Sequence, residues 1–436
     1  MIKGFSKFSQ EQKVDTLAAQ FNLPVSFKET LRSHHHRELQ GLYNQFAENT
    51  ISNFYLPYNV APGFVINKKE YAIPMVVEES SVVAAASKAA KFWSAHGGFS
   101  TKVLSVTKSG QLFFTTEWSF EELSALMPDI TSALRCSVGE ITHNMEKRGG
   151  GITGFKLTSE SLVDEQTYCL MVSFETADSM GANFINTCLE KMGDALVTFL
   201  IQKNDNRHIE INMAILSNYT PECLVQCALS CPIEDLQAYS GVYSPQDFAL
   251  RFKKAVSLAK HNPSRAVTHN KGIMNGIDAV VLATGNDFRA IEAGVHAYAS
   301  RAGAYASLTD IVLENDTFTY TLKLPLALGT VGGLTSLHPM AKLSLLLLDE
   351  PSASELMQIV AAAGMANNFS AVAALVTSGI QKGHMKMHLS NILAALNADP
   401  MECQKAKKYF SERDVSHSAV KLYLDAERLK NKRHEY

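Results

Sequence analysis

The strongest constraint on the fold is one stretch, from Lys102 to about Ser217, in which strand and helix patterns follow each other in a fixed order. The strand-like segments TKVLSVT and QLFFTT come first, and an amphipathic helix, two strands, a long helix and a last strand, IEINMAILS, follow. Ser119 and Glu122 have the spacing of a capping box at the start of the first helix. The order β-α-β-β-α-β is that of a ferredoxin-like unit.

Helix-rich blocks flank this unit on both sides. The N-terminal block is expected to hold short amphipathic helices and then a buried strand at Tyr71–Val77, YAIPMVV. A helix capped by Ser80 is expected to follow and to end at Gly97-Gly98. We therefore predict an α+β fold, in which a helix-rich large domain carries an inserted ferredoxin-like (βαββαβ) small domain and a helical C-terminal flap.

Beyond Asn218 the chain becomes largely helical and alanine-rich, with strands expected near Ala279–Ala283 and Phe318–Pro325. From about Gly379 the composition turns polar and charged, which fits either a loosely attached helical lid or a plain solvated terminal helix. The predicted boundaries are 1–104 and 220–378 for the two parts of the large domain, 105–219 for the small domain and 379–436 for the C-terminal flap.

Composition and charge narrow the class of protein. The 436 residues have a formal net charge of -3, which gives no reason to expect nucleic acid or an anionic membrane as the main partner. The start, MIKGFSKFSQEQK, lacks the apolar core of a signal peptide, and no apolar run is expected to reach the ~18 to 20 residues that span a bilayer. Seven scattered cysteines indicate reduced thiols and a cytoplasmic location.

Three of the cysteines, Cys223, Cys227 and Cys231, recur at every fourth position. A structural zinc site needs four ligands, and neither a CxxC pair nor a nearby histidine completes such a set. We interpret the three as small residues on one helix face and expect no metal.

Two glycine-containing motifs could contact a nucleotide. Gly149, Gly151 and Gly154 match GxGxxG, but a helix precedes them and a strand follows, which reverses the context of a dinucleotide-binding fold. DSMGAN, at 178–183, ends a strand and opens the long helix, where free amide groups can bind a pyrophosphate. The alternative is that Asp178 or Ser179 merely caps that helix.

Four polar groups stand in apolar or glycine-rich settings: Glu79 of the pair Glu78-Glu79, Lys271, Asp287 and His384. Each also has a plain interpretation. Glu79 could be a solvated strand end and Lys271 a surface lysine, while Asp287 could cap a helix and His384 could lie on one face of a helix. His388 lies four residues after His384, so the two histidines could also be metal ligands.

Taken together, these segments resemble 3-hydroxy-3-methylglutaryl-coenzyme A (HMG-CoA) reductases of class II. The resemblance runs from Glu48 to His388 and rests on four segments in the expected order: VVEESSVVAAASKAAKFW, SRAVTHNKGIMNGIDAVVLATGNDFRAIEAGVHAYASR, LALGTVGGLTSLHP and GHMKMH. It implies that HMG-CoA is reduced to mevalonate and CoA with two reduced nicotinamide cofactors, or the reverse. It also implies a cofactor-binding small domain, a histidine-bearing flap and a homodimer, or an assembly of dimers, with the active site at its interface.

The resemblance also implies residue roles. Lys271 would stabilise the oxyanion formed from the thioester carbonyl, and His384 would protonate the departing CoA thiolate. Glu79 would be the proton donor and Asp287 would tune both the lysine and the glutamate. The substrate positions carried over are Ser81, Arg265, Asn275 and His388, the last as a support of the flap, and the cofactor positions are Thr142, Asp178, Met180, Gly181, Ala182, Asn183 and Asn218.

Three positions depart from the family pattern. The dimer motif reads ENTIS, with Ser52 in place of a glycine, and a Gln-Asn pair appears as Asn367-Asn368. Thr142 stands where NADH-preferring members carry an aspartate. A threonine, unlike an aspartate, does not repel the 2′-phosphate of NADPH, so this position favours NADPH as the cofactor. His143 or Lys147 could supply that phosphate contact instead.

Two alternative functions stay open. The protein could be another CoA-thioester or nicotinamide oxidoreductase of the same fold, or a catalytically idle structural dimer.

Overall fold

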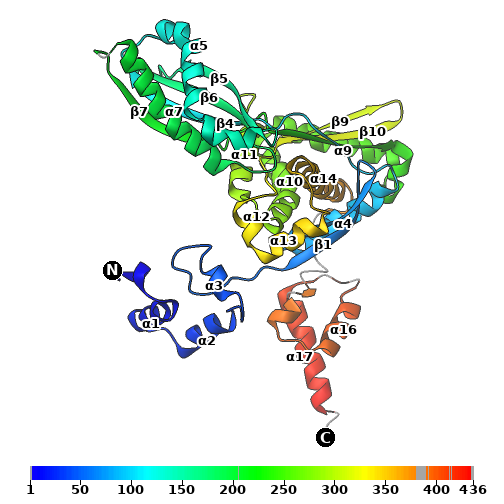
Figure 1. Ribbon diagram of the computed structural model, residues 1–436. Coiled ribbons are helices and arrows are strands. Elements are labelled where there is room, and N and C mark those ends of the chain that lie inside the picture. The colour runs from blue at the N-terminus through cyan, green and yellow to red at the C-terminus, as the bar shows by residue number, and fades with distance from the viewer. Residues whose placement is uncertain are drawn as a thin grey trace. The chain divides into compact units, whose positions relative to one another are not determined.

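The computed structural model describes residues 2–204, 206–379, 389–390, 392–411, 413 and 415–433. The chain divides into two compact units, Met1–Pro57 and Tyr58–Tyr436, so the predicted segment 1–104 contains parts of both. Figure 1 gives the elements in chain order. Both His384 and His388 lie outside the described residues.

The first unit consists of short helices, as the sequence predicts. Ser52 of the ENTIS motif donates its hydroxyl to the carbonyl of Leu31 at 2.7 Å, so the residue that replaces a glycine ties this segment to the last turn of the helix Val25–Ser33. The elements are η1 (Phe5–Lys7), α1 (Gln10–Gln20), α2 (Val25–Ser33) and α3 (Gln40–Tyr43).

The second unit begins with an antiparallel hairpin of β1 (Tyr58–Ile66) and β2 (Lys69–Val76), which contains most of the strand predicted at 71–77. Helix α4 (Ser80–Ser94) follows. Its N-cap is Glu79 and not the predicted Ser80, because the backbone of Glu79 is still extended, with φ -108° and ψ 111°. A candidate functional residue therefore lies where the strand turns into the helix.

A four-stranded antiparallel sheet crosses the large domain in the order β3-β8-β10-β9. TKVLSVT does not open the small domain as expected, because β3 pairs with β8 in this larger sheet. Cys227 and Cys231 lie on β8 and not on a helix; residues four apart also share one face of a strand. The strands are β3 (Ser100–Val103), β8 (Leu224–Pro232), β9 (Thr309–Glu314) and β10 (Thr317–Pro325).

Two long helices, α10 (Pro263–Ala283) and α14 (Ala353–Val376), pack against each other in the core. The strand expected at 279–283 is the last turn of α10. A buried run such as Val280-Val281 fits a core helix as well as a strand. Helix α14 is long and apolar enough to cross a membrane by length and composition alone, but 78% of its most apolar window is buried inside the protein, as in the core helix of a globular domain.

The remaining helices of the large domain complete this core. They are η2 (Ile233–Leu236), α8 (Gln237–Ser240), α9 (Pro245–His261), α11 (Phe288–Ala299), α12 (Gly333–Leu337) and α13 (Pro339–Leu347).

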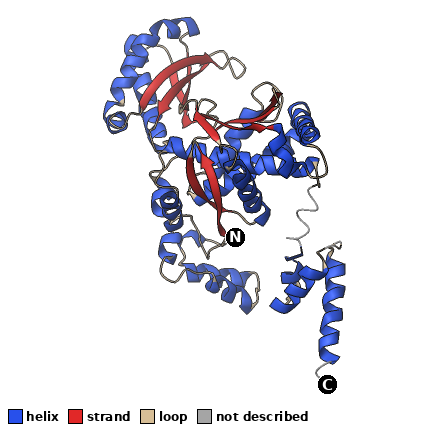
Figure 2. Cartoon of the chain, turned by 90° about the vertical axis from the view of Figure 1, so that its right-hand side faces the viewer, coloured by secondary structure: helices blue, strands red, loops and turns tan. Residues whose placement is uncertain are grey.

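The small domain has the predicted β-α-β-β-α-β order, with one extra short helix among its described residues, and its sheet order is β5-β6-β4-β7. Figure 2 distinguishes the strands, in red, from the helices, in blue. The predicted capping box of Ser119 and Glu122 is present. Helix α7 packs so closely over β4 that a Cβ on Gly110 would lie 2.5 Å from a methyl carbon of Leu189. The elements are β4 (Lys108–Thr116), α5 (Phe120–Ser137), α6 (Gly139–Glu146), β5 (Gly151–Ser159), β6 (Thr167–Glu175), α7 (Ala182–Lys203) and β7 (Ile209–Leu216).

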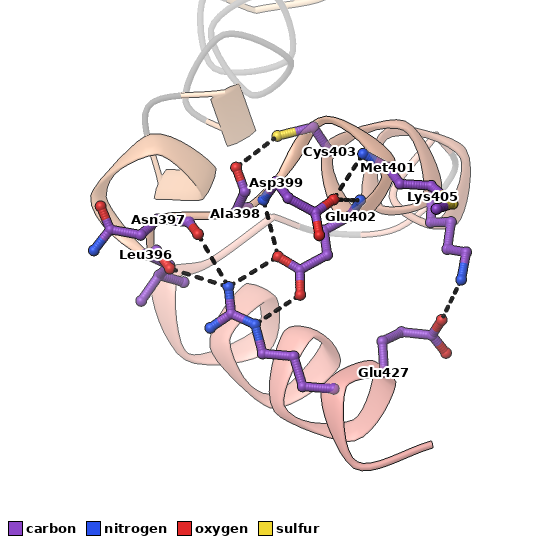
Figure 3. A network of polar contacts seen from close by, with 10 residues as sticks. Leu396, Asn397, Ala398, Asp399, Met401, Glu402, Cys403, Lys405 and Glu427 are labelled. Atoms are coloured by element: carbon purple, nitrogen blue, oxygen red, sulfur yellow. Dashed lines mark hydrogen bonds and ion pairs between the residues drawn. The ribbon is translucent and has the colours of Figure 1, made fainter. Parts of the chain in front are cut away.

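The C-terminal segment is a small helical cluster with its own core, which includes Leu393, Ala406 and Leu424. It contains α16 (Pro400–Tyr409) and α17 (His417–Arg433). Glu402 lies at the centre of a polar network that joins these helices (Figure 3). The segment is therefore helical, as predicted, and more than a single solvated helix, while its role as a lid stays a prediction.

Candidate functional site

One face of α10 carries two of the predicted site residues and one further polar residue. Lys271, Asn275 and Asp278 lie at positions i, i+4 and i+7, and such residues share a helix face. Lys271 is exposed, and no hydrogen bond or ion pair holds its ammonium among the residues that the structure describes. The opposite side of α10, with Ile273 and Ile277, is buried in the core. The helix thus presents a free cation from a rigid support.

Glu79 lies beside this helix, because both elements that flank it, β2 and α4, pack against α10. Glu79 is half-buried, whereas its neighbour Glu78 is exposed, so the second of the pair is the one turned toward the protein. The hydroxyl of Ser81 donates a short hydrogen bond to the Glu79 carboxyl. The structure therefore joins a predicted proton donor to a predicted substrate-binding residue.

Asp287 is the N-cap of α11, where its Oδ1 accepts the backbone N–H groups of Arg289 and Ala290 at 3.1 and 3.2 Å. The structure thus confirms the plain interpretation of Asp287 as a helix cap. Within the described part of the chain no hydrogen bond joins Asp287 to Lys271, which lies roughly three helical turns before the end of α10. The structure of one chain does not bring this predicted pair together.

Arg265 lies in the first turn of α10, about 240° around the helix from Lys271 at ~100° per residue. It is half-buried, and burial lowers the pKa of its guanidinium. Burial and the charge of Arg265 lower the pKa of the neighbouring His269 to about 3, so that imidazole is neutral. Its Nε2 lies 2.7 Å from Thr309 Oγ1, a buried pair that sequence reasoning did not identify.

The Asn367-Asn368 pair lies inside the large domain, on α14, and both side chains are buried. Asn368 donates to the backbone carbonyl of His269 at 2.9 Å and accepts a short hydrogen bond from the hydroxyl of Tyr320. Asn368 therefore joins α14 to α10 and β10 and helps to hold the helix that carries Lys271, whereas Asn367 donates to the carbonyl of Ala363 within α14 at 3.4 Å.

Asp278 forms an acid pair with Glu292 of α11 that the sequence analysis also missed. Burial and the Glu292 carboxyl raise the pKa of Asp278 to about 8, so Asp278 is mostly protonated at neutral pH. One of its carboxyl oxygens is buried without a hydrogen-bond partner among the described residues. A carboxyl inside the apolar stretch GIDAVVLA was the available signal.

The DSMGAN loop leaves the start of α7 open. The N-cap of α7 is Gly181, which makes no side-chain cap and has a φ of +91°. The expected alternative, that Asp178 or Ser179 caps this helix, is wrong, because Asp178 Oδ1 instead accepts the N–H of Ala353 at the start of α14, at 2.8 Å. The amide groups that follow Gly181, at Ala182 and Asn183, are thus available to an anion such as a pyrophosphate.

Two further predicted cofactor residues lie together. Met180 and Asn218 line the same small cavity, of about 10 Å³, at the junction of the small domain with α11. Gly294 of α11 permits this close approach, because a Cβ there would lie 2.7 Å from the carbonyl oxygen of Asn218. A space of this size holds no more than one water molecule, so the cofactor itself would have to lie outside it.

Thr142 is only 2% exposed, and its hydroxyl bonds back to the carbonyl of Gly139 in its own helix at 3.4 Å. His143 and Lys147, on the same helix, are exposed. Among the described residues, no group of three or more histidine, cysteine or acidic side chains could hold a metal ion.

Comparison with known proteins agrees with these features. The family profile described as hydroxymethylglutaryl-coenzyme A reductase matches residues 11–389. The 3-hydroxy-3-methylglutaryl-coenzyme A reductase of Archaeoglobus fulgidus is 34% identical over 413 residues, which cover 92% of this chain and 89% of that protein. The probable 3-hydroxy-3-methylglutaryl-coenzyme A reductase of Borreliella burgdorferi is 32% identical over 374 residues, which cover 86% and 83%.

Solved structures give the same result. A class II 3-hydroxy-3-methylglutaryl-CoA reductase from Streptococcus pneumoniae, bound to NADPH in open conformations, is 34% identical with a TM-score of 0.69 and covers 86% of this chain and 99% of its own. A second structure of the reductase from that organism is 33% identical with a TM-score of 0.70, and the match covers 97% of this chain and 99% of that one.

Proposed function

The chain belongs to the hydroxymethylglutaryl-coenzyme A reductase family, with class II relatives among solved structures, and on that premise we propose that it interconverts HMG-CoA and mevalonate. The forward reaction consumes two reduced nicotinamide cofactors and releases CoA. The observation that carries the proposal is the free ammonium of Lys271 on a rigid helix, in a chain that matches the family over residues 11–389.

Lys271 acts as the oxyanion stabiliser in this proposal. When hydride reaches the thioester carbonyl, negative charge builds on its oxygen, and a cation placed there stabilises the transition state more than the ground state. An ammonium that makes no hydrogen bond within the described chain can turn its donors to that oxygen without first breaking another contact.

Glu79 supplies the proton for the oxygen of the bound aldehyde, and Ser81 helps to orient it. This is supported by the hydrogen bond from Ser81 to Glu79 and by the half-buried position of the carboxyl beside α10. Asp287 tunes the lysine and the glutamate, and because Asp287 and Lys271 are not joined within one chain, we propose that this contact forms in the dimer or on substrate binding.

The remaining substrate roles follow the resemblance. Arg265 and Asn275 hold the HMG carboxylate and hydroxyl, which fits a half-buried guanidinium able to make paired hydrogen bonds with a carboxylate. His384 protonates the CoA thiolate and His388 supports the C-terminal flap, 379–436.

The ferredoxin-like small domain holds the nicotinamide cofactor, which supplies the hydride. The residues present fit its pyrophosphate, because Gly181 opens α7 without a side-chain cap and leaves the amides of Ala182 and Asn183 to an anion. NADPH is favoured over NADH. The S. pneumoniae structure with NADPH supports this, and because Thr142 is buried, the exposed His143 and Lys147 are better placed to meet a 2′-phosphate.

The protein works as a homodimer, or as an assembly of dimers, in the cytoplasm. Exposed leucines on α12 and α13 support an interface, since Leu337 and Leu346 are 56% and 63% exposed on one short stretch of chain. Seven free cysteines fit a reducing compartment. Light scattering of the wild-type protein and of Leu346→Lys tests the dimer.

Cofactor absorbance in the presence of HMG-CoA tests the function. Wild-type protein should oxidise NADPH or NADH, and Lys271→Met should lose at least ~100-fold in kcat, as expected for the loss of an oxyanion stabiliser. Lys254→Met, which changes an exposed lysine of α9 in the same way, should retain full activity. No oxidation of either cofactor by the wild-type protein would overturn the proposal and favour an idle dimer, and turnover of another CoA thioester alone would favour a different oxidoreductase.

A further inference from the structure

Lys108, the first residue of β4, is a cation in the interior of the protein. It is 3% exposed, and its ammonium donates to Thr176 Oγ1 at 2.5 Å and to the carbonyl oxygen of Ser179 at 2.8 Å. Burial lowers the pKa of Lys108, and the nearby Cys223 and Asp178 oppose that shift. Burying a charge is costly unless its donors are satisfied, so these two hydrogen bonds are what hold the side chain there.

The acceptors of Lys108 belong to one tight turn between β6 and α7. The hydroxyl of Thr176 donates to the same Ser179 carbonyl at 2.7 Å, and the N–H of Ser179 returns to the carbonyl of Thr176 at 3.0 Å. Gly181 follows, and a Cβ there would lie 2.5 Å from the Thr176 methyl. The turn that Lys108 braces therefore fixes where the first amide groups of α7 point.

The outer side of this turn contacts the loop that follows β10. Ser179 pairs with Val331 in a parallel bridge, and a Cβ on Gly329 would lie 2.4 Å from the nitrogen of Met180. The N–H of Gly329 donates to Asn286 Oδ1 at 2.8 Å, and Asn286 directly precedes Asp287. Lys108 thus contacts the buried side of this turn. The other side of the turn contacts the loop after β10, and that loop is hydrogen-bonded to the residue before Asp287, the proposed tuning residue.

We propose that Lys108 is a positioning residue, whose ammonium shapes the 176–181 turn and thereby sets the affinity for the cofactor pyrophosphate without touching the cofactor. The inference rests on the proposed function, in which the start of α7 binds that pyrophosphate. Its physical basis is the convergence of two donors, Lys108 Nζ and Thr176 Oγ1, on one carbonyl oxygen. Removal of the ammonium leaves this oxygen with a single, uncharged donor, and charge-assisted hydrogen bonds are about twice as strong as neutral ones.

Titration of the apoprotein with NADPH, followed by cofactor fluorescence, tests the affinity. Lys108→Met should raise the Kd roughly tenfold or more, the range for loss of a hydrogen bond to a charged group, while the KM for HMG-CoA stays within twofold. Lys102→Met is the matched control, because Lys102 is an exposed lysine six residues away on β3, and it should leave the Kd unchanged. A Kd for Lys108→Met within twofold of the control, or a parallel rise in the KM for HMG-CoA, overturns the inference.

A milder pair of variants and a second measurement separate this inference from the proposed function. Thr176→Val keeps the shape that packs against Gly181 but removes the hydroxyl, whereas Thr176→Ser keeps the hydroxyl. Amide hydrogen exchange of 176–184 in the apoprotein should be about tenfold faster in Lys108→Met and in Thr176→Val, and unchanged in Lys102→Met and Thr176→Ser. Unchanged exchange in Lys108→Met overturns the inference even when the enzyme is active. Failure of the wild-type protein to bind or oxidise either cofactor instead overturns the proposed function.

Discussion

Asp178, in the loop before α7, accepts a hydrogen bond of 2.8 Å from the backbone N–H of Ala353, the first residue of α14. The carbonyl oxygen of Asp178 also accepts the N–H of Thr330 at 2.8 Å. One residue of the small domain thus contacts both the start of the central helix and the loop after β10. Asp178 therefore links the small domain to two segments of the large domain, in addition to its place in the proposed cofactor-binding loop.

Asp178→Ala should lower the free energy of unfolding by about 1 kcal/mol, because an amide at the start of α14 loses its acceptor. Asp178→Asn keeps an oxygen at the same position and should stay close to wild type. Urea titration followed by tryptophan emission measures the difference, since Trp93 lies in the large core. Equal stability of the alanine and asparagine variants would contradict the role given to this contact.

The acid pair of Asp278 and Glu292 should make stability depend on pH. The folded-state pKa of Asp278 is raised to about 8, mainly by burial and then by Glu292, above the ordinary value of 3.8. Between these two values the folded protein holds a proton that the unfolded chain releases, so stability falls as pH rises from about 4 to about 8 and levels off above that. Urea midpoints measured at intervals of pH should show this slope, and Asp278→Asn should flatten it, because an amide is neutral throughout. A variant with the wild-type slope would show that another group titrates.

The ion pair between Arg428 and Glu402 should hold the C-terminal cluster together. Arg428 Nε and Nη2 donate to the two carboxyl oxygens of Glu402 at 2.7 and 2.9 Å, and Nη2 also reaches the carbonyl of Asn397 at 3.2 Å (Figure 3). Arg428→Met should therefore speed amide exchange in 392–411 clearly more than Lys405→Met, which removes a single, longer contact of 3.4 Å to Glu427.

The same pair predicts a response to acid. Arg428 is the main reason that the pKa of Glu402 is lowered, so the stabilisation is present above the ordinary carboxyl pKa and is lost as pH falls through the lowered value. Acid should bring the exchange of the wild-type cluster closer to that of Arg428→Met. A gap between the two that does not narrow at low pH would exclude the ion pair as the cause.

The order of the small domain was readable from the sequence because local signals agree there. Ser119 and Glu122 start a helix at the predicted residue, and the strand before it, β4, alternates between buried and half-buried residues. The same kind of signal failed for Cys223, Cys227 and Cys231, because a spacing of four fits one face of a helix and one face of a strand equally well. It also failed at Ala279–Ala283, where all five residues are apolar and the sequence shows no periodicity.

The candidate site was predictable only in part, for a related reason. Lys271 and Glu79 stand in distinctive motifs, and the structure places their helix and strand end side by side. Partners far apart along the chain leave no local trace: Asp178 bonds to a residue 175 positions away, and Lys108 gives no sign in the sequence that it is buried. Such contacts depend on how the two domains meet, and no short motif encodes that.

The close contact between α10 and α14 should depend on one glycine and not on its neighbour. A Cβ on Gly276 would lie 2.4 Å from the backbone carbonyl oxygen of Ala363, which cannot move without displacing α14. Gly276→Ala should therefore lower the free energy of unfolding by roughly 2 kcal/mol or more. Gly272→Ala, one turn earlier, would place a Cβ 3.6 Å from Asn368 Nδ2 and 4.0 Å from Ala371 Cβ, which are ordinary contacts. It should be neutral or gain up to ~1 kcal/mol, because alanine favours a helix interior. Urea titration of the two variants gives the comparison, and a Gly276→Ala protein as stable as Gly272→Ala would mean that the helices do not pack as closely in solution.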